Sequence, residues 1–394
     1  MTTLAVGVLS EHNSSEHRVA LDPSATARIV HSGMAVLVES GSGTDAGFDD
    51  HSFAAAGATV TTRADVIAKC DLLASLGFPP DSVTNSLNSG QAVIGLLDPF
   101  NNLDAVRGLA DRGVILVALE LLPRTLSRAQ AMDALSSQSS AAGYRAAIVA
   151  AESFGRYLPM MITASGTAVP AKVIVIGTGV AGLQAIATTK RLGAVVTGYD
   201  VRAASRAEVE SLGARFLTSS VAAGTGEGGY ARSMTAEEQA AQQQELAAAL
   251  TAFDIIITTA KVPGRIPPLL VSAQTLSALK SGTVCVDLGA SDKGGNVFGS
   301  VDGSTHTTVD GVVVVGGGNL AAQLPTSASQ MYGRNMSAVI DSLASQGAIT
   351  VDPTDEIHAS IVVSHHGGIT SPAVRAALNL PPLGSTDSMK VQVA

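Results

Sequence analysis

The sequence predicts an α/β protein made of two doubly wound domains that a long helix joins. Short runs of β-branched and other apolar residues, each of the length of a buried strand, alternate along the 394 residues with stretches of helical character. An alanine-rich segment with few glycines, residues 128–157, predicts the connecting helix. The apolar fraction of 46% is enough to fill two cores.

The first domain is expected to hold a parallel sheet, because its apolar runs are separated by helical segments. Pro23 suits the first turn of one of these helices. A helix expected over residues 327–343 returns to this domain, so we place it at residues 1–137 with 321–394, ending in a loose tail from residue 381. The expected strands are residues 4–9, 35–39, 71–76, 92–97 and 114–118, with a second helix around residues 102–112.

The second domain is expected to span residues 138–320. Its first strand, residues 173–176, is followed by a helix over residues 180–192. The remaining strands are expected at residues 194–199, 254–258, 283–288 and 312–315. This order of elements is again typical of a doubly wound sheet.

Three glycines between the first strand and the first helix of the second domain predict a dinucleotide site. Gly177, Gly179 and Gly182 have the spacing G-x-G-x-x-G, which permits a tight turn, close approach of a pyrophosphate, and close packing of helix on strand. The free N–H groups of the helix N-terminus, at Val180 and Ala181, would face the phosphates. The alternative is a purely structural turn in a Rossmann-like domain.

The end of the second strand predicts which nucleotide binds. Asp200 lies 23 residues after Gly177 (200 − 177), close to the spacing of about 20 at which an acid reads the ribose hydroxyls. Asp200 would repel the 2′-phosphate of NADP, whereas Arg202 could pair with it. We favour NAD(H), with Asp200, Val201 and Arg202 bordering the adenosine.

A glycine-rich stretch, residues 222–234, interrupts the second domain. Loops of this length inside a compact domain are usually functional or mobile. Tyr230, beside Gly229, could fold over a bound ligand and exclude water. The alternative is a solvated insertion.

Composition excludes several classes of function. The net charge of −9 argues against nucleic acid as a partner. No secretory signal is expected, and no apolar stretch approaches the roughly 18 residues that cross a bilayer. Cys70 and Cys285 are expected to be buried thiols of a reducing compartment. His365 and His366 have no third ligand at a useful spacing, so no metal site is expected.

Several motifs resemble the soluble NAD(H)-binding component of proton-translocating nicotinamide nucleotide transhydrogenase, which is the first domain of its alpha subunit. The most specific are residues 123–145, PRTLSRAQAMDALSSQSSAAGYR, and residues 226–234, GEGGYARSM. Residues 258–260, 263–264, 286–288 and 294–296 are similar as well. The match extends over residues 6–343, and this family shares its two-domain fold with the alanine dehydrogenases.

Two absences separate this chain from the alanine dehydrogenases. Where those enzymes use a lysine, this chain has Ser75, and no histidine stands between His51 and His306 to match theirs. A keto acid would therefore find no group to polarise it and move its proton. Arg18 matches their keto-acid arginine and is interpreted as a structural residue, in a surface or inter-domain ion pair.

The resemblance implies a function and a set of partners. It implies that NAD(H) binds in the cleft between the two domains and exchanges a hydride directly with NADP(H), which an NADP(H)-binding beta subunit carries. A second, membrane-spanning alpha polypeptide would complete the coupling to proton translocation. This chain would be a cytoplasmic homodimer, peripheral to the inner face of the plasma membrane. The alternatives are an alanine dehydrogenase and a regulatory protein that binds NAD without catalysis.

The resemblance also implies the residues beside the nicotinamide. These are Gln130, Asp133 and Ser136, which would share one face of an ideal helix, together with an arginine. The family has four residues between the arginine and the glutamine, where residues 125–129 make five, so Arg124 and Arg128 are both candidates. We favour Arg124 because Pro123 precedes it. The cofactor-binding segment also includes Thr125, Leu126 and Ser127.

Overall fold

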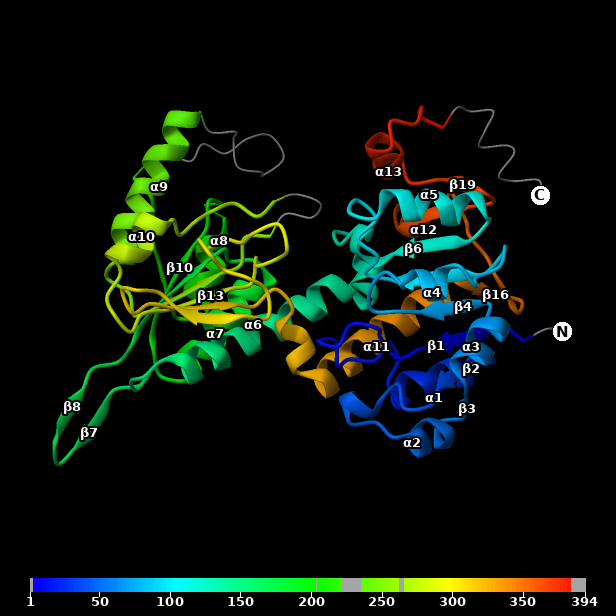
Figure 1. Ribbon diagram of the computed structural model, residues 1–394, viewed down its shortest axis with the longest axis horizontal. Helices are drawn as coiled ribbons and strands as arrows, with labels where there is room; N and C mark the ends of the chain where they lie inside the picture. Colours follow the sequence, from blue (N-terminus) through cyan, green and yellow to red (C-terminus); the bar gives the residue numbers. More distant parts are fainter. Residues whose placement is uncertain (1–2, 203, 221–234, 262–265, 384–394) are drawn as a thin grey trace. The chain divides into compact units, whose positions relative to one another are not determined.

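The computed structural model describes residues 3–202, 204–220, 235–261 and 266–383 (Figure 1). The chain divides into two compact units. Unit 1 comprises Met1–Gln138 with Leu324–Ala394, and unit 2 is Ser139–Gln323. Each unit is built around its own mostly parallel sheet.

The sheet of unit 1 orders its strands β19-β18-β6-β5-β4-β1-β2-β3, and all pairs from β6 to β3 are parallel. The central order 3-2-1-4-5-6 is that of a Rossmann fold. The parallel strands are β1 Ala5–Val8, β2 Ala35–Glu39, β3 Thr59–Thr61, β4 Leu72–Ala74, β5 Ala92–Gly95 and β6 Ile115–Ala118. Two antiparallel strands, β18 Val362–His365 and β19 Gly368–Ile369, extend the edge beyond β6.

Helices cover both faces of this sheet, so successive residues of a strand enter different cores. In β4, for example, Leu72 belongs to one buried cluster and Leu73 to the other. Strands buried on both faces read as uninterrupted apolar runs, which is why the sequence predicted them. The helices of unit 1 are α1 Pro23–His31, α2 Asp50–Ala55, α3 Arg63–Lys69, α4 Asp81–Thr84, α5 Leu103–Asp111, α11 Pro325–Leu343, α12 Glu356–Ile361 and α13 Pro372–Ala377, with 3-10 turns η1 Thr44–Ala46, η2 Leu119–Leu121 and η3 Ser127–Met132 and a small hairpin, β16 Ala344–Ser345 and β17 Ala348–Ile349.

The sheet of unit 2 has the order β11-β10-β9-β12-β13-β15-β14, with only β14 antiparallel. The chain moves outward from β9 to β10 and then crosses to β12, so the carboxyl end of β9 lies at a topological switch point. Its strands are β9 Lys172–Ile176, β10 Val195–Tyr199, β11 Arg215–Phe216, β12 Ile255–Thr258, β13 Val284–Asp287, β14 Thr305–Thr307 and β15 Val313–Gly316, and its helices are α7 Val180–Arg191, α8 Ser205–Ser211, α9 Ala236–Leu250, α10 Ala273–Ala278 and the 3-10 turn η5 Leu320–Gln323.

The predicted long helix over residues 128–157 is wrong at both ends. The α-helix, α6, runs only from Ala134 to Ser153, and a separate 3-10 turn, η3, precedes it. The break lies at Asp133, whose ψ of 79° is not helical and whose Oδ1 accepts the N–H of Ser136 at 2.8 Å. A side chain that caps the next helix cannot also continue the previous turn as α-helix.

The strands and the two helices Val180–Arg191 and Pro325–Leu343 agree with the predictions to within a few residues. The shortest strands, such as β3 and β11, were not predicted because two or three residues carry no readable period. A hairpin in unit 2, β7 Met161–Thr163 with β8 Gly166–Ala168, was also missed (Figure 1).

Two partly buried carboxyl groups hold the carboxyl ends of strands in unit 1. Oε1 of Glu11 accepts the N–H of Leu76, just after β4, at 2.8 Å. Glu120 accepts the N–H groups of Leu97 and Asp98, just after β5. Burial raises the pKa of Glu11 to about 7, aided by a neighbouring glutamate and opposed by the backbone bond and by two arginines. Burial likewise raises the pKa of Glu120 to about 7, with a contribution from Asp98.

These pKa values predict that unit 1 loses stability as pH rises toward 7. An unfolded glutamate has a pKa of about 4.3. Because the folded-state pKa is higher, the contribution of each carboxyl is complete below about pH 4 and is lost as pH rises to about 7. Glu11→Gln or Glu120→Gln keeps an acceptor oxygen without the charge. Each variant should raise the free energy of unfolding at pH 8 by up to about 3 kcal/mol and flatten its fall between pH 5 and 8.

Urea unfolding measured across pH 5–8 checks this prediction. The control is Glu210→Gln, at an exposed glutamate of α8, which should leave the profile unchanged. Parallel profiles for the wild type and both buried-site variants would contradict it.

Candidate nucleotide and nicotinamide site

The glycine-rich turn of unit 2 has the strand–turn–helix–strand form that the sequence predicted. Strand β9 ends at Ile176, and Gly177 follows with a φ of +88°, a conformation that side chains disfavour. Its N–H donates to the carbonyl of Tyr199, the last residue of β10, at 2.8 Å. Helix α7 begins at Val180, with Gly179 as its N-cap.

The three glycines have different surroundings. A Cβ on Gly182 would stand 1.9 Å from the carbonyl oxygen of Gly177, so only glycine lets α7 pack this close to the turn. A Cβ on Gly177 would stand 2.6 Å from Oγ1 of Thr259, which donates to the Gly177 carbonyl at 2.8 Å. Around Gly179 the space is open to at least 4 Å. A phosphate group can therefore approach the backbone at Gly179.

The N-terminus of α7 presents donors for an anion. Gly179 offers no side-chain cap, and the first helical residues include Val180, which is exposed, and Ala181. Uncapped N–H groups with the positive end of a helix dipole bind phosphates. Helix α6 approaches here too, since a Cβ on its Gly143 would stand 2.0 Å from the Ala181 carbonyl oxygen.

Asp200 stands at the end of β10 and is bonded to both sides of the turn. Its Oδ2 accepts the N–H of Thr178 at 2.8 Å and the Thr178 hydroxyl at 3.1 Å. Its Oδ1 accepts the backbone N–H of Arg202 at 2.9 Å, and the Arg202 guanidinium donates to both oxygens, at 3.0 and 3.1 Å. Burial raises the pKa of Asp200, but the bonds from Arg202 and Thr178 outweigh it and lower the pKa overall.

This pairing changes the interpretation of Arg202. The guanidinium folds back onto Asp200 and neutralises it, so it is not an unattached cation awaiting a 2′-phosphate. The carboxylate is 7% exposed and the guanidinium 48% exposed. A ribose hydroxyl that bonds to Asp200 must share or replace one of the Arg202 bonds. Val201, between them, is exposed.

In unit 1 the predicted nicotinamide-side segment lies on the surface, and its two arginines differ. Arg124 is exposed, and among the described residues none pairs or hydrogen-bonds with its guanidinium. Arg128, also exposed, pairs through Nη1 with Oδ2 of Asp355 at 2.5 Å. Asp355 is the N-cap of α12, and the bond from Arg128 lowers its pKa to about 2. Arg128 is therefore committed to an ion pair.

The expectation that Gln130, Asp133 and Ser136 share one helical face is wrong. Gln130 lies in the 3-10 turn η3 and is exposed, whereas Asp133 is the residue that caps α6 and Ser136 belongs to the first turn of α6. Around them Leu126 packs against the core, and Thr125 and Ser127 are exposed. Gly229 and Tyr230, predicted to form a lid, lie outside the described residues.

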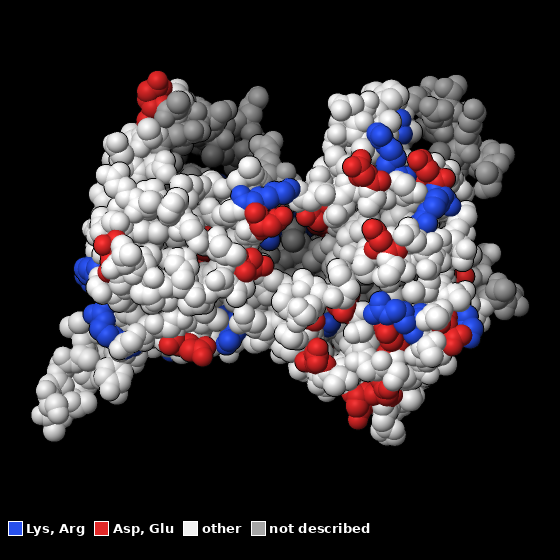
Figure 2. Space-filling view, viewed as in Figure 1, with Lys and Arg blue, Asp and Glu red and all other residues white. Residues whose placement is uncertain are grey.

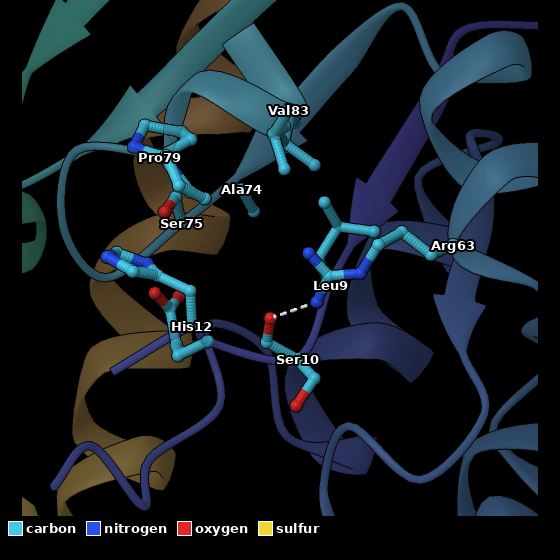
Figure 3. Close-up of a pocket in the computed structure, with 11 residues that line it drawn as sticks. Leu9, Ser10, His12, Arg63, Ala74, Ser75, Pro79 and Val83 are labelled. Atoms are coloured by element: carbon cyan, nitrogen blue, oxygen red, sulfur yellow. Dashed lines mark hydrogen bonds between the residues drawn. The ribbon is translucent and has the colours of Figure 1, made fainter. Parts of the chain in front are cut away.

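The edge of unit 1 where alanine dehydrogenases would hold a keto acid offers no such site. The Ser75 hydroxyl donates to the carbonyl of Gly77 at 2.7 Å, and the hydroxyl of the fully buried Tyr332 donates to the Ser75 carbonyl at 2.7 Å. The pocket beside Ser75 has a volume of about 20 Å³, room for about one water (Figure 3). Figure 3 shows Arg63 at one wall of this pocket, donating to the carbonyl oxygen of Ser10 at 2.7 Å.

Several residues around the site were not predicted. Thr259 and Gly143 shape the turn, as described above. Arg18 is buried and not a surface residue, and it bonds to Gln138 inside unit 1.

The two adjacent histidines show no sign of a metal site. Within the described ranges no three His, Cys, Asp or Glu side chains converge on one point. The rings of His365 and His366 lie 3.8 Å apart at the end of β18. Burial, followed by the charge of His366, lowers the pKa of His365 to about 4.

Comparison with protein-family models matches almost the whole chain. Residues 7–142 match the alanine dehydrogenase/PNT N-terminal domain, and residues 146–372 match the alanine dehydrogenase/PNT C-terminal domain. The first of the two alpha-subunit polypeptides of NAD(P) transhydrogenase from Rickettsia prowazekii is 37% identical over 380 residues, 94% of this chain and 97% of that protein. The same polypeptide of Rhodospirillum rubrum is 38% identical, over 94% of this chain and 99% of its own length.

Solved structures separate the two branches of this family in the same order. The transhydrogenase from Sinorhizobium meliloti gives a TM-score of 0.83 at 38% identity and covers 93% of this chain and 99% of its own. An L-alanine dehydrogenase gives a TM-score of 0.79 at 25% identity and covers 95% and 99%. The alanine dehydrogenases are thus the more distant homologues. The chain belongs to the alanine dehydrogenase/PNT family, as a homologue of the first alpha-subunit polypeptide of NAD(P) transhydrogenase.

Proposed function

We propose that this chain is the NAD(H)-binding subunit of a proton-translocating nicotinamide nucleotide transhydrogenase. The observation that carries the proposal is the 37–38% identity to transhydrogenase alpha-subunit polypeptides over 94% of the chain. Ser75 and the water-sized pocket beside it support the choice, because they leave no keto-acid machinery of the alanine dehydrogenase kind.

In unit 2 the glycine turn takes the pyrophosphate. Gly177, Gly179 and Gly182 bring the backbone close to it, and the N–H groups at Val180 and Ala181 donate to its oxygens. Asp200 accepts from the ribose hydroxyls, with Val201 and Arg202 beside the adenosine. Gly229 and Tyr230 belong to a loop that covers the bound nucleotide and excludes water.

In unit 1 the residues 124–136 lie beside the nicotinamide. Arg124 is the nicotinamide-side arginine, because Arg128 is held by Asp355. Gln130 has no bonded partner for its amide among the described side chains, so it can bond to a ribose or to the partner's cofactor. Asp133 and Ser136 orient the carboxamide; Thr125, Leu126, Ser127 and Arg128 complete the segment.

The chemistry asks little of the protein beyond placement. NAD(H) supplies a hydride donor or acceptor at C4, and transfer to a second nicotinamide needs no proton from a side chain. The residues of this chain therefore bind, orient the ring and keep water out, which can account for much of the rate. The second nucleotide, NADP(H), is carried by the beta subunit.

The partners follow from the same assignment. A second, membrane-spanning alpha polypeptide anchors the complex, and this chain lies at the cytoplasmic, inner face of the plasma membrane. Over the residues that the structure describes, no helix has the length and apolar character to cross a bilayer. Figure 2 shows acidic and basic side chains intermixed on the face in view, without the basic surface that nucleic acid would require.

Mixing the chain with the NADP(H)-binding subunit tests the proposal. NADH and NADP⁺ together should give NADPH at a rate at least about a hundredfold above either protein alone, because hydride transfer needs both rings in contact. Gly182→Ala should abolish the rate, since its Cβ would stand 1.9 Å from the Gly177 carbonyl. L-Alanine with NAD⁺ should give no NADH.

Each other outcome selects an alternative. Oxidation of L-alanine would identify an alanine dehydrogenase. Tight NADH binding without transfer in the complete complex of all subunits would identify a regulatory protein that only binds NAD.

The β7–β8 hairpin supports a homodimer. Its strands and flanking residues carry no charged side chain, and Figure 2 shows neither blue nor red atoms on the projecting hairpin. Ile162 and Val169 are each 76% exposed, and Met160 is 59% exposed. An isolated two-stranded hairpin is marginally stable in water, and exposed apolar patches mark interfaces. We assign this hairpin to the contact with a second copy.

Changing the hairpin should separate the dimer. Ile162→Asp places a charge in the apolar contact, so sedimentation at micromolar concentration should give the mass of one chain, against two for the wild type. Val309→Asp is the matched control, because Val309 is a fully exposed valine elsewhere in unit 2. A monomeric wild type, or an Ile162→Asp variant that stays dimeric, would show that the hairpin is not the dimer contact.

A further inference from the structure

Arg18 forms a buried ionic contact in unit 1 that the proposed function has not used. Its side chain is 9% exposed, and the carboxylate of Glu16 receives bonds from its Nε at 2.7 Å and from its Nη2 at 2.6 Å. The remaining nitrogen, Nη1, donates to Oε1 of Gln138 at 2.7 Å. Glu16 balances the charge, so Arg18 can direct a strong hydrogen bond at Gln138 inside the protein.

Gln138 passes this contact on to the helix that begins within the nicotinamide-side segment. It lies in α6, two residues after Ser136, and is itself buried. Its Nε2 donates to the carbonyl of Ala328 in α11 at 3.0 Å and to the hydroxyl of Ser137 at 3.2 Å. Both atoms of the amide are therefore engaged, and the first turns of α6 are fixed against α11 and the N-terminal segment.

A second contact holds the turn just before α6. The Asn335 amide, also on α11, donates to the carbonyl of Ala131 in η3 at 2.8 Å. Asp133 lies between the two anchored positions and caps α6 through Ser136. The rigid helix α11 thus supports the 131–138 stretch at both ends, and Arg18 completes the support at Gln138.

We propose that Arg18 is a positioning residue for hydride transfer, acting through Gln138 to set the place of Asp133 and Ser136. The inference rests on the proposed function. A planar guanidinium can bond Glu16 and Gln138 at once in this geometry, which the point charge of a lysine cannot reproduce. A displacement of about 1 Å at such a site can lower a rate about a hundredfold.

The test uses the full chain with Gln138→Leu and Arg18→Lys, measured without cofactor, with NADH, and in the complex with the NADP(H)-binding subunit. The control is Val374→Ala, which opens a buried position of α13 outside this network. Amide hydrogen exchange over residues 131–140 should quicken at least about tenfold in Gln138→Leu. Hydride transfer should fall at least about tenfold, while the Kd for NADH changes less than about threefold, since unit 2 holds the pyrophosphate and ribose.

Arg18→Lys should shift exchange and transfer in the same direction by smaller factors, and Val374→Ala should change neither. The inference is overturned if Gln138→Leu behaves as Val374→Ala does. It is also overturned if exchange quickens while the transfer rate stays within about twofold of the wild type, because the network would then be structural only.

Failure of the proposed function is separately visible. A wild-type chain that transfers no hydride in the complete complex removes that function. Hydrogen exchange and the fluorescence of bound NADH then still report on Arg18: unchanged exchange and an unchanged nicotinamide emission in Gln138→Leu would reject the positioning role as well.

Discussion

The structure of unit 2 depends on one close approach, that of helix α7 to the turn after β9. Gly182 leaves the helix backbone free to pack against the Gly177 carbonyl, where any Cβ would stand 1.9 Å away. This approach aims the N-terminus of α7 at the open space around Gly179. The same turn is tied to β10, because Thr178 donates twice to Asp200. The phosphate donors and the ribose acceptor are thus fixed by one short stretch of backbone.

Much of this could be predicted because it is encoded locally. Doubly covered parallel strands read as apolar runs, and the glycine spacing states the shape of the turn directly. The start of α6 could not be predicted from period or propensity, because a single side chain, Asp133, decides it by capping the helix. The pairing of Arg128 with Asp355, far apart in the sequence, is tertiary and leaves no local signal. It nevertheless resolves which arginine is available, in favour of Arg124.

Unit 1 shows how a family fold can keep its framework while its chemistry changes. The Ser75 hydroxyl is satisfied by a nearby carbonyl, and the pocket beside it has room for about one water. Arg18 is likewise satisfied within the protein, by Glu16 and Gln138. The burial of Arg18 could not be predicted, since the sequence places Glu16 beside it but does not show Gln138 there. Polar groups at this edge serve to hold the backbone, which suits a subunit whose task is to orient a ring.

The central claim is that unit 2 selects NAD(H) through Asp200, with Arg202 committed to that carboxylate. Titration of the purified chain with NADH and with NADPH, followed by the fluorescence of the ligand, tests it most directly. We expect NADH to bind at least about tenfold more tightly than NADPH, a difference of about 1.4 kcal/mol, and Arg202→Ala to retain that preference. Equal or tighter binding of NADPH by the wild type, lost in Arg202→Ala, would show that Arg202 reads a 2′-phosphate and would contradict the assignment.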